Sequence, residues 1–279
     1  MIILAALLAA ATPATVAGIE KDAPPTAWRA IPPENLMLVN TPKGNVVIEL
    51  APGFAPRHVA AIRALVASHR FDGGAIIRVQ DNYVVQWAIK GSDGKTGTGP
   101  KLPPEYERPA EGHAFTPLPY PDPYGRAGFS EGWQAAMDGD KQWLVHCYGM
   151  VGVGRNLAPD NGDGSELYAV IGQAPRHLDR NIALVGRVIE NIEAWSALPR
   201  GSEAMGFYKT DPEKVALTSV RLASDLPAAS RPRFEVMDTG SASFRALIEA
   251  RANRREEFFN RPAGGVDICN VKIPVRRQP

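Results

Sequence analysis

Short apolar runs separated by glycine and proline constrain the fold of this chain more than any other feature. The 279 residues include 26 glycines and 25 prolines, residue types that end strands and helices and favour turns. The first apolar runs are only a few residues long and cover 36–41, 46–50, 75–79 and 83–89. This pattern predicts short strands joined by turns and argues against a helical bundle.

Further runs bring the expected number of strands to about eight; they lie at residues 146–153, 167–172, 182–189 and 215–223. Apolar residues at helical spacing predict a helix that opens at Pro52–Pro56, a second over 192–198 and a third within 241–260. Strands and helices do not alternate regularly, which disfavours a doubly wound parallel sheet. The expected fold is mainly β: a closed eight-stranded antiparallel barrel capped by two helices, because closure removes exposed strand edges.

The amino-acid composition distinguishes three further segments outside this barrel: a linker, an insertion and a C-terminal extension. Residues 18–35 are polar and rich in proline, and we expect them to form a linker. The barrel spans residues 36–224 and is interrupted at 92–146 by a Gly- and Pro-rich segment with little periodicity, which is typical of an insertion on a scaffold. Residues 225–279 form a C-terminal extension that holds the third helix.

The first 17 residues predict export. Residues 2–11 form an uncharged apolar run that is too short to cross a bilayer, as in a signal peptide. Cleavage is expected after Ala14 or Ala17. No Lys or Arg follows Met1 directly, which leaves two explanations: the natural start lies upstream of Met1, or the segment is a helix that belongs to the fold. Export predicts a periplasmic or secreted protein with no stable membrane insertion after removal of the signal.

The net charge bears on nucleic-acid binding, and the cysteines bear on disulfide formation. The formal net charge of +1 provides no general attraction for nucleic acid, so no nucleic-acid partner is expected. Cys147 and Cys269 are the two cysteines, and in an oxidising compartment they are able to form a disulfide. The alternative is two separately buried thiols.

Motifs for other chemistries fail. The five histidines have no paired spacing for zinc, so no metal site is predicted. The sequence contains no G-x-S-x-G hydrolase motif, which leaves a small-molecule hydrolase without a nucleophile. No cofactor is expected.

Four segments resemble cyclophilin-type peptidyl-prolyl cis/trans isomerases and occur in that family's order. Residues 71–86 (FDGGAIIRVQDNYVVQ) resemble its segment F-Y-[DN]-G-x-x-F-H-R-V-x-x-x-F-x-x-Q-G. Residues 41–50 (TPKGNVVIEL), followed by Ala55-Pro56, are similar to its opening hairpin and helix start. Residues 164–168 (GSELY) resemble its G-S-Q-F-F strand, and HLD with VGRV, at 177–179 and 185–188, resembles its W-L-D…F-G-x-V. The resemblance covers residues 37–224 and indicates a divergent bacterial member.

This resemblance implies a proline-binding groove on the outer face of the barrel. Arg78 takes the place of the family's catalytic arginine, and Gln86 that of a glutamine that supports the arginine and the substrate backbone. The apolar proline pocket is expected at Tyr83, Val84, Leu167, Tyr168 and Leu178. Further substrate-binding positions are Gly154, Arg155, Glu166 and His177.

Several residues depart from the family pattern. Ile77 and Ile182 replace histidines, and His177 stands where tryptophan or phenylalanine is common. Glu166 replaces a glutamine and Arg155 an asparagine. Glu166 is expected either to pair with Arg155 or to reach Arg78, where it would compete with substrate and slow catalysis.

The resemblance implies an isomerase that acts on proline-containing polypeptides and assists the folding of exported proteins. Arg78 would donate hydrogen bonds to the twisted prolyl amide. Two alternatives remain at the residue level: Arg78 forms an ion pair on a solvated face, and Tyr83 and Tyr168 are ordinary barrel residues. The corresponding alternative for the whole protein is a catalytically weak or inactive module that binds a proline-containing protein segment.

Overall fold

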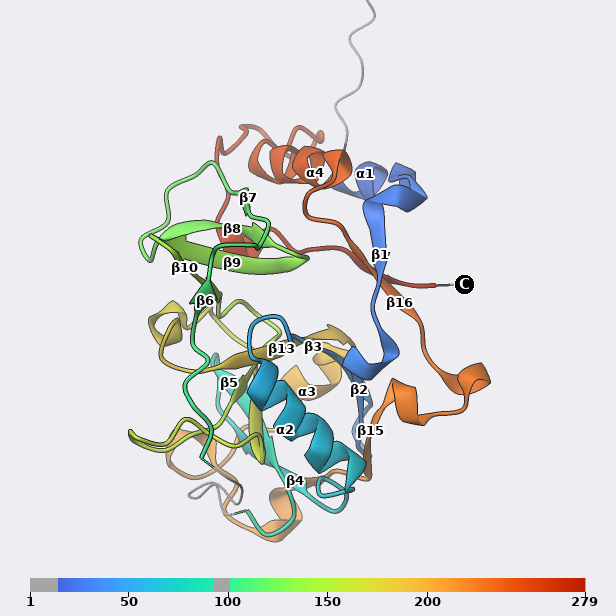
Figure 1. The fold of residues 1–279 in the computed structure, drawn as a ribbon, viewed down its shortest axis with the longest axis vertical. Helices are drawn as coiled ribbons and strands as arrows, with labels where there is room; N and C mark the ends of the chain where they lie inside the picture. The colour runs from blue at the N-terminus through green and yellow to red at the C-terminus, as the bar shows by residue number, and fades with distance from the viewer. Residues whose placement is uncertain (1–14, 93–100, 279) are drawn as a thin grey trace, which may run out of the picture.

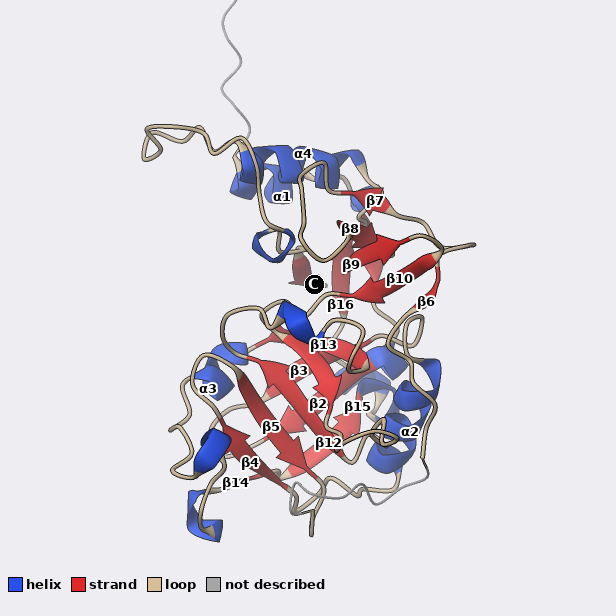
Figure 2. Ribbon diagram, turned by 90° about the vertical axis from the view of Figure 1, so that its left-hand side faces the viewer, coloured by secondary structure: helices blue, strands red, loops and turns tan. Residues whose placement is uncertain are grey.

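The protein has two lobes in this computed structural model, which describes residues 15–92 and 101–278 (Figures 1 and 2). The main lobe consists of a nine-stranded curled sheet with helices α2 (Pro56–Ala67) and α3 (Ile192–Ser196). The second lobe contains a five-stranded sheet, a three-stranded sheet, and helices α1 (Val16–Asp22) and α4 (Ala242–Ala252). All three helices expected from apolar spacing are confirmed as α2, α3 and α4.

Neighbouring strands of the nine-stranded sheet are all antiparallel. In spatial order they are β14 (Val215–Ala216), β4 (Ala75–Val79), β5 (Val84–Ala88), β12 (Glu166–Val170), β11 (Met150–Val153), β13 (Leu184–Glu190), β3 (Val46–Leu50), β2 (Leu36–Asn40) and β15 (Ser219–Leu222). Each lies within or beside a run that the sequence marks as a strand.

The sequence predicted a closed barrel of eight strands, and this prediction is wrong in strand number and in closure. The sheet has nine strands and is open and curled. Its edge strands, β14 and β15, are consecutive in the chain and are separated by residues 217–218. There the chain changes partners, because Leu217 N–H donates to the Gly74 carbonyl and Thr218 N–H donates to the Asn40 carbonyl. One chain segment therefore serves both edges, and no ladder joins them.

The interior of the curled sheet is apolar. The rings of Trp87 and Trp195 lie 4.7 Å apart, and both side chains are fully buried. Helix α2 covers this core with Val59, Ile62 and Val66, which recur at the spacing of one helix face. Burial of these residues leaves the outer face of β4, β5 and β12 available for a site.

The segment expected as an insertion, in which little periodicity marked any strand, forms a sheet of its own. Its strands are, in spatial order, β6 (Arg108–Pro109), β10 (Lys141–Leu144), β9 (Trp133–Asp138), β8 (Arg126–Ser130) and β7 (Thr116–Pro117). The C-terminal extension packs on this sheet, with Phe129 and Phe244 in edge-to-face contact at 4.7 Å. The two segments outside the barrel thus form one core, which also takes in the outward-facing Val47 and Leu184 of the main lobe.

The expected linker is also structured. It contains most of α1 and the strand β1 (Trp28–Ala30), which pairs with β16 (Phe234–Met237); β16 in turn pairs with β17 (Val275–Arg277). Residues 1–14, which hold most of the predicted signal peptide, lie outside the described residues. Cleavage after Ala14 leaves α1 intact, whereas cleavage after Ala17 removes Thr15, whose hydroxyl accepts a bond from Gly18 N–H.

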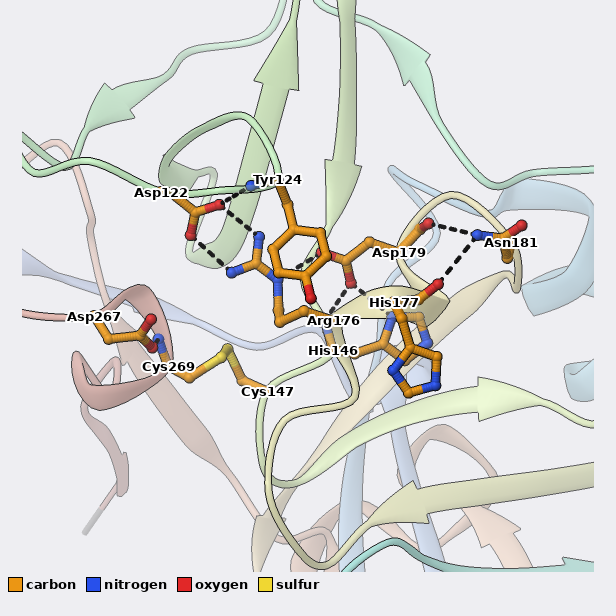
Figure 3. Close-up of polar contacts among 10 residues, drawn as sticks. All are labelled: Asp122, Tyr124, His146, Cys147, Arg176, His177, Asp179, Asn181, Asp267 and Cys269. Carbon is orange, nitrogen blue, oxygen red and sulfur yellow. Dashed lines mark hydrogen bonds and ion pairs between the residues drawn. A yellow bond between two sulfur atoms is a disulfide. The ribbon is translucent and has the colours of Figure 1, made fainter.

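A disulfide joins Cys147 and Cys269, whose Cα atoms lie 5.0 Å apart (Figure 3). It connects the chain just before β11 to the C-terminal extension and is part of the core between the lobes. Within the described residues, no helix is both long and apolar enough to span a bilayer.

Candidate active site

A cavity of about 270 Å³ opens on the outer face of the curled sheet. Its lining residues come from strands β4, β5, β11 and β12, from the short 3-10 helices η3 (Arg176–Leu178) and η4 (Ala204–Gly206), and from the loops beside them. Nine of the eleven residues predicted for the site line it: Arg78, Tyr83, Val84, Gln86, Gly154, Arg155, Glu166, Tyr168 and Leu178.

Strand register explains how distant residues meet there. Arg78 on β4 is directly opposite Gln86 on β5, and Gln86 is opposite Tyr168 on β12. Tyr168 is in turn opposite Gly152 on β11. Side chains at directly opposed positions share a face of the sheet, so the three side chains form one row across the outer face. Gly152 is required in this row, because a Cβ at this position would lie 2.3 Å from Tyr168 Oη.

The guanidinium of Arg78 is held by neutral acceptors. Its Nε donates to the Met205 carbonyl (2.6 Å), its Nη1 donates to Gln86 Oε1 (3.2 Å), and its Nη2 donates to Gln80. No carboxylate among the described residues forms an ion pair with it. Burial lowers the pKa of Arg78, but an arginine remains charged in proteins. The geometry therefore places a cation without a charged partner, among the described residues, at the edge of the cavity.

Comparison with known proteins agrees with this arrangement. The model of the family described as cyclophilin type peptidyl-prolyl cis-trans isomerase/CLD matches residues 36–221, which is most of the chain. The chain belongs to this cyclophilin family.

Relatives outside the family model support the same assignment. Proteins named probable peptidyl-prolyl cis-trans isomerase from Brucella suis and Brucella melitensis are each 27% identical over 203 residues, covering 68% of this chain and 85% of theirs. The crystal structure of the cyclophilin AquaCyp293 from Hirschia baltica aligns with a TM-score of 0.74 and 25% identity. It covers 94% of this chain and 96% of its own, so the structural likeness extends beyond residues 36–221.

Two predicted site residues lie elsewhere in this cyclophilin. Leu167 is fully buried in the core inside the curled sheet, because consecutive residues of a strand point to opposite faces and its neighbour Tyr168 takes the outer face. His177 is exposed on η3 and is not among the described residues that line the cavity. Its neighbour Leu178 lines the cavity instead.

Glu166 makes neither of the pairs expected for it. Its Oε2 accepts a bond from Gln86 Nε2 (3.0 Å), and its Oε1 accepts one from the Ser92 hydroxyl. Arg155 donates to two backbone carbonyls, those of Asn181 and Asn156. Gln86 therefore lies between the acid and Arg78, accepting from the guanidinium while it donates to the carboxylate.

Sequence reasoning missed the wall formed by Met205 and Phe207. The Arg78 guanidinium lies 5.2 Å from the centre of the Phe207 ring and 5.5 Å from that of Tyr83. Met205 lies in the short 3-10 helix η4, and Phe207 follows it directly. Both come more than 120 residues after Arg78 in a segment without periodic pattern, and no sequence signal marked them. Ile182, named as a departure from the family pattern, also lines the cavity.

The residues of this site have no arrangement that would hold a metal. Within the described parts of the chain, no group of three or more His, Cys, Asp or Glu side chains lies close enough to bind an ion.

Proposed function

We propose that this cyclophilin isomerises X-Pro peptide bonds in polypeptides and that Arg78 is the catalytic residue. The observation that carries the proposal is the Arg78 guanidinium at the edge of a cavity lined by Tyr83, Val84 and Leu178, with neutral acceptors around it. The sequence resemblance, which matches Arg78 to the family's catalytic arginine, points the same way.

The reaction requires a donor at this place. Rotation of a peptide bond is opposed by a barrier of ~18–20 kcal/mol that arises from amide resonance, and uncatalysed X-Pro isomerisation takes tens to hundreds of seconds. Twisting the bond leaves a lone pair on the prolyl nitrogen. A guanidinium that donates to this nitrogen stabilises the twisted state more than either planar state.

The surrounding residues support this donor. Gln86 accepts from Nη1 and fixes the plane of the guanidinium, whose rigid fork requires little further ordering. Tyr83, Val84 and Leu178 provide walls on which a prolyl ring is buried, and exclusion of water strengthens the electrostatic interaction.

The direct test is Arg78→Ala. We expect kcat/KM for cis-to-trans conversion of an X-Pro peptide to fall by roughly 10²–10³, the scale of losing one transition-state donor. Arg126→Ala is the matched control, because Arg126 is exposed on β8 in the second lobe, and its kcat/KM should equal that of the unmodified protein. A wild-type protein with no rate above background defeats the proposal.

A non-catalytic binding module is the second candidate, and one contact favours it. Arg78 Nε already donates to the Met205 carbonyl at 2.6 Å, so one donor of the guanidinium is occupied without substrate. In that case a proline-containing peptide binds equally well after Arg78→Ala, and no protein concentration accelerates isomerisation. Peptide binding and isomerisation rates, measured for the wild-type protein and for Arg78→Ala, decide between the two functions.

We further propose that the protein acts on exported polypeptides in the periplasm or outside the cell. The apolar run at residues 2–11 and the Cys147–Cys269 disulfide support this location, since disulfides persist in oxidising compartments. N-terminal sequencing of protein recovered from the periplasmic fraction should begin at Thr15 or Gly18. Full-length protein retained in the cytoplasm would contradict the proposal.

A further inference from the structure

A buried chain of polar contacts begins at the cavity. Tyr168, which lines the cavity, has its hydroxyl 2.9 Å from Nε2 of His146. His146 is fully buried, and its Nδ1 lies 2.8 Å from Oδ1 of Asp179, which also accepts from the His146 backbone N–H at 3.0 Å. Tyr168 is therefore anchored beneath the surface by a histidine and a carboxylate.

This chain of polar contacts continues into the second lobe (Figure 3). Oδ2 of Asp179 accepts from Nε of Arg176 at 2.6 Å. The other end of the guanidinium makes two bonds to the carboxylate of Asp122, at 2.8 and 3.0 Å. The side chains of all three are at least nine-tenths buried, and Asp122 lies between β7 and β8 of the sheet built by the insertion.

The direction of each bond follows from the charges. Asp179 accepts from the Arg176 guanidinium and from the His146 backbone N–H. Its Oδ1 also faces Nδ1 of His146 as an acceptor, so this ring nitrogen carries the proton. Burial lowers the pKa of His146 and raises that of Tyr168 well above its usual value. Neutral His146 thus accepts at Nε2, and Tyr168 must donate to it, which fixes both the ring and the hydroxyl.

We propose that Asp122 is a positioning residue for the prolyl site and that it acts through Arg176, Asp179 and His146 on Tyr168. This inference rests on the proposed function, and it assigns a role to the insertion: the second lobe holds a wall of the groove in place. The helix η3 strengthens the connection, because it carries both Arg176 and Leu178, and Leu178 lines the cavity.

A double-mutant cycle tests this connection with Asp122→Asn and Tyr168→Phe, both of which preserve side-chain size. Both changes interrupt the same chain of polar contacts. We therefore expect each to lower kcat/KM by roughly 2- to 30-fold, the range found for coupling through packed networks. The combined variant should be no slower than the slower single variant. Independent effects of the two residues would instead multiply, and a role for Asp122 in stability alone would leave kcat/KM of Asp122→Asn unchanged.

Glu107→Gln is the matched control. Glu107 also belongs to the insertion and binds Arg180, next to Asp179, at 2.8 Å, but both side chains of this pair are partly exposed and neither lines the cavity. Its kcat/KM should stay within about twofold of wild type, as for an exposed pair. Thermal unfolding of every variant verifies that the folded fractions are equal. If Asp122→Asn does not fold, His146→Gln replaces it, because that change breaks the same chain one contact before Tyr168.

The outcomes separate the two proposals. Multiplying effects, or an unchanged kcat/KM in Tyr168→Phe, overturn the inference while the proposed function stands. An inactive wild-type protein overturns both. Loss of activity in Glu107→Gln to the same extent as in Asp122→Asn would also overturn the inference about Asp122. Any contact between the insertion and the main lobe would then be enough to support activity.

Discussion

Individual polar residues around the groove are satisfied by partners that are themselves held in place. Gln86 accepts from Arg78 and donates to Glu166, while Tyr168 donates to His146. A buried polar group without a partner costs free energy, so such a network is stable only when every member is bonded. The network therefore holds Gln86 and Tyr168 each in one orientation beside the cavity.

His146 predicts a dependence of stability on pH. Burial lowers its pKa below the ordinary value of about 6.5, so at a pH between the two values the unfolded chain binds a proton that the folded protein does not. The stabilisation is fully present above pH ~6.5 and is lost as the pH falls through the folded-state pKa. Urea unfolding at pH 7.5, 6.5 and 5.5 should show a decreasing free energy of unfolding.

The variant His146→Gln is the control for this pH effect. It keeps a neutral polar side chain and should flatten the dependence between pH 7.5 and 5.5. Carboxylates with lowered pKa values, such as Asp72 beside Arg221, lose their contribution only below pH ~4 and do not interfere. An equally steep dependence in the variant would show that another group is responsible.

At the scale of elements, helix α2 depends on a residue distant in the chain. It begins at Pro56, and the preceding Ala55 provides no side-chain cap. The carboxylate of Glu105, from the insertion, instead accepts from the backbone N–H groups of Arg57 and His58 at 2.9–3.1 Å. It also lies 2.7 Å from Nδ1 of His58, which is fully buried. A negative charge at this helix end also interacts favourably with the helix dipole.

Removal of this cap should destabilise the protein. We expect Glu105→Ala to lower the free energy of unfolding by about 1–3 kcal/mol, because it leaves the buried His58 nitrogen and the first N–H groups of the helix without their acceptor. Chemical denaturation measures the change. Glu111→Ala, at an exposed position of the same insertion, should change it by less than about 0.5 kcal/mol. Equal effects of the two substitutions would be evidence against the cap.

At the scale of the whole molecule, the two lobes share a core, a disulfide and the chain from Asp122 to Tyr168. The likeness to the Hirschia baltica cyclophilin covers 94% of this chain, so it includes most of the second lobe. The insertion and the C-terminal extension stabilise each other, because strands β8 and β9 bury one face against α4 and the residues around Cys269.

The disulfide should contribute measurably to the stability of the whole. Cys147 and Cys269 are separated by 122 residues, and closing so long a loop restricts the unfolded chain strongly. We expect the double variant Cys147→Ala, Cys269→Ala to lose about 2–5 kcal/mol of unfolding free energy. A reductant should lower the denaturation midpoint of the wild-type protein and leave that of the double variant unchanged. A reductant-insensitive wild type would contradict this expectation.

The sequence by itself determined the short antiparallel strands, the helices α2, α3 and α4, and most of the groove. Strand β4 lies at the predicted residues 75–79, and nine of the eleven predicted site residues line the cavity. The strands and helices were predictable because turn residues, alternation and helical spacing report local backbone preferences. The groove residues followed from the resemblance to the cyclophilin family, and strand register brings Arg78, Gln86 and Tyr168 together.

Only the tertiary structure decided which residues meet across long stretches of chain. It turned Leu167 inward, placed Met205 against Arg78, left the curled sheet open at β14 and β15, and connected Asp122 to Tyr168 through a buried network. Contacts of this kind depend on how the lobes pack and on which buried polar groups find hydrogen-bond partners. These contacts form only when the chain has folded, because their two partners lie in distant segments of the sequence.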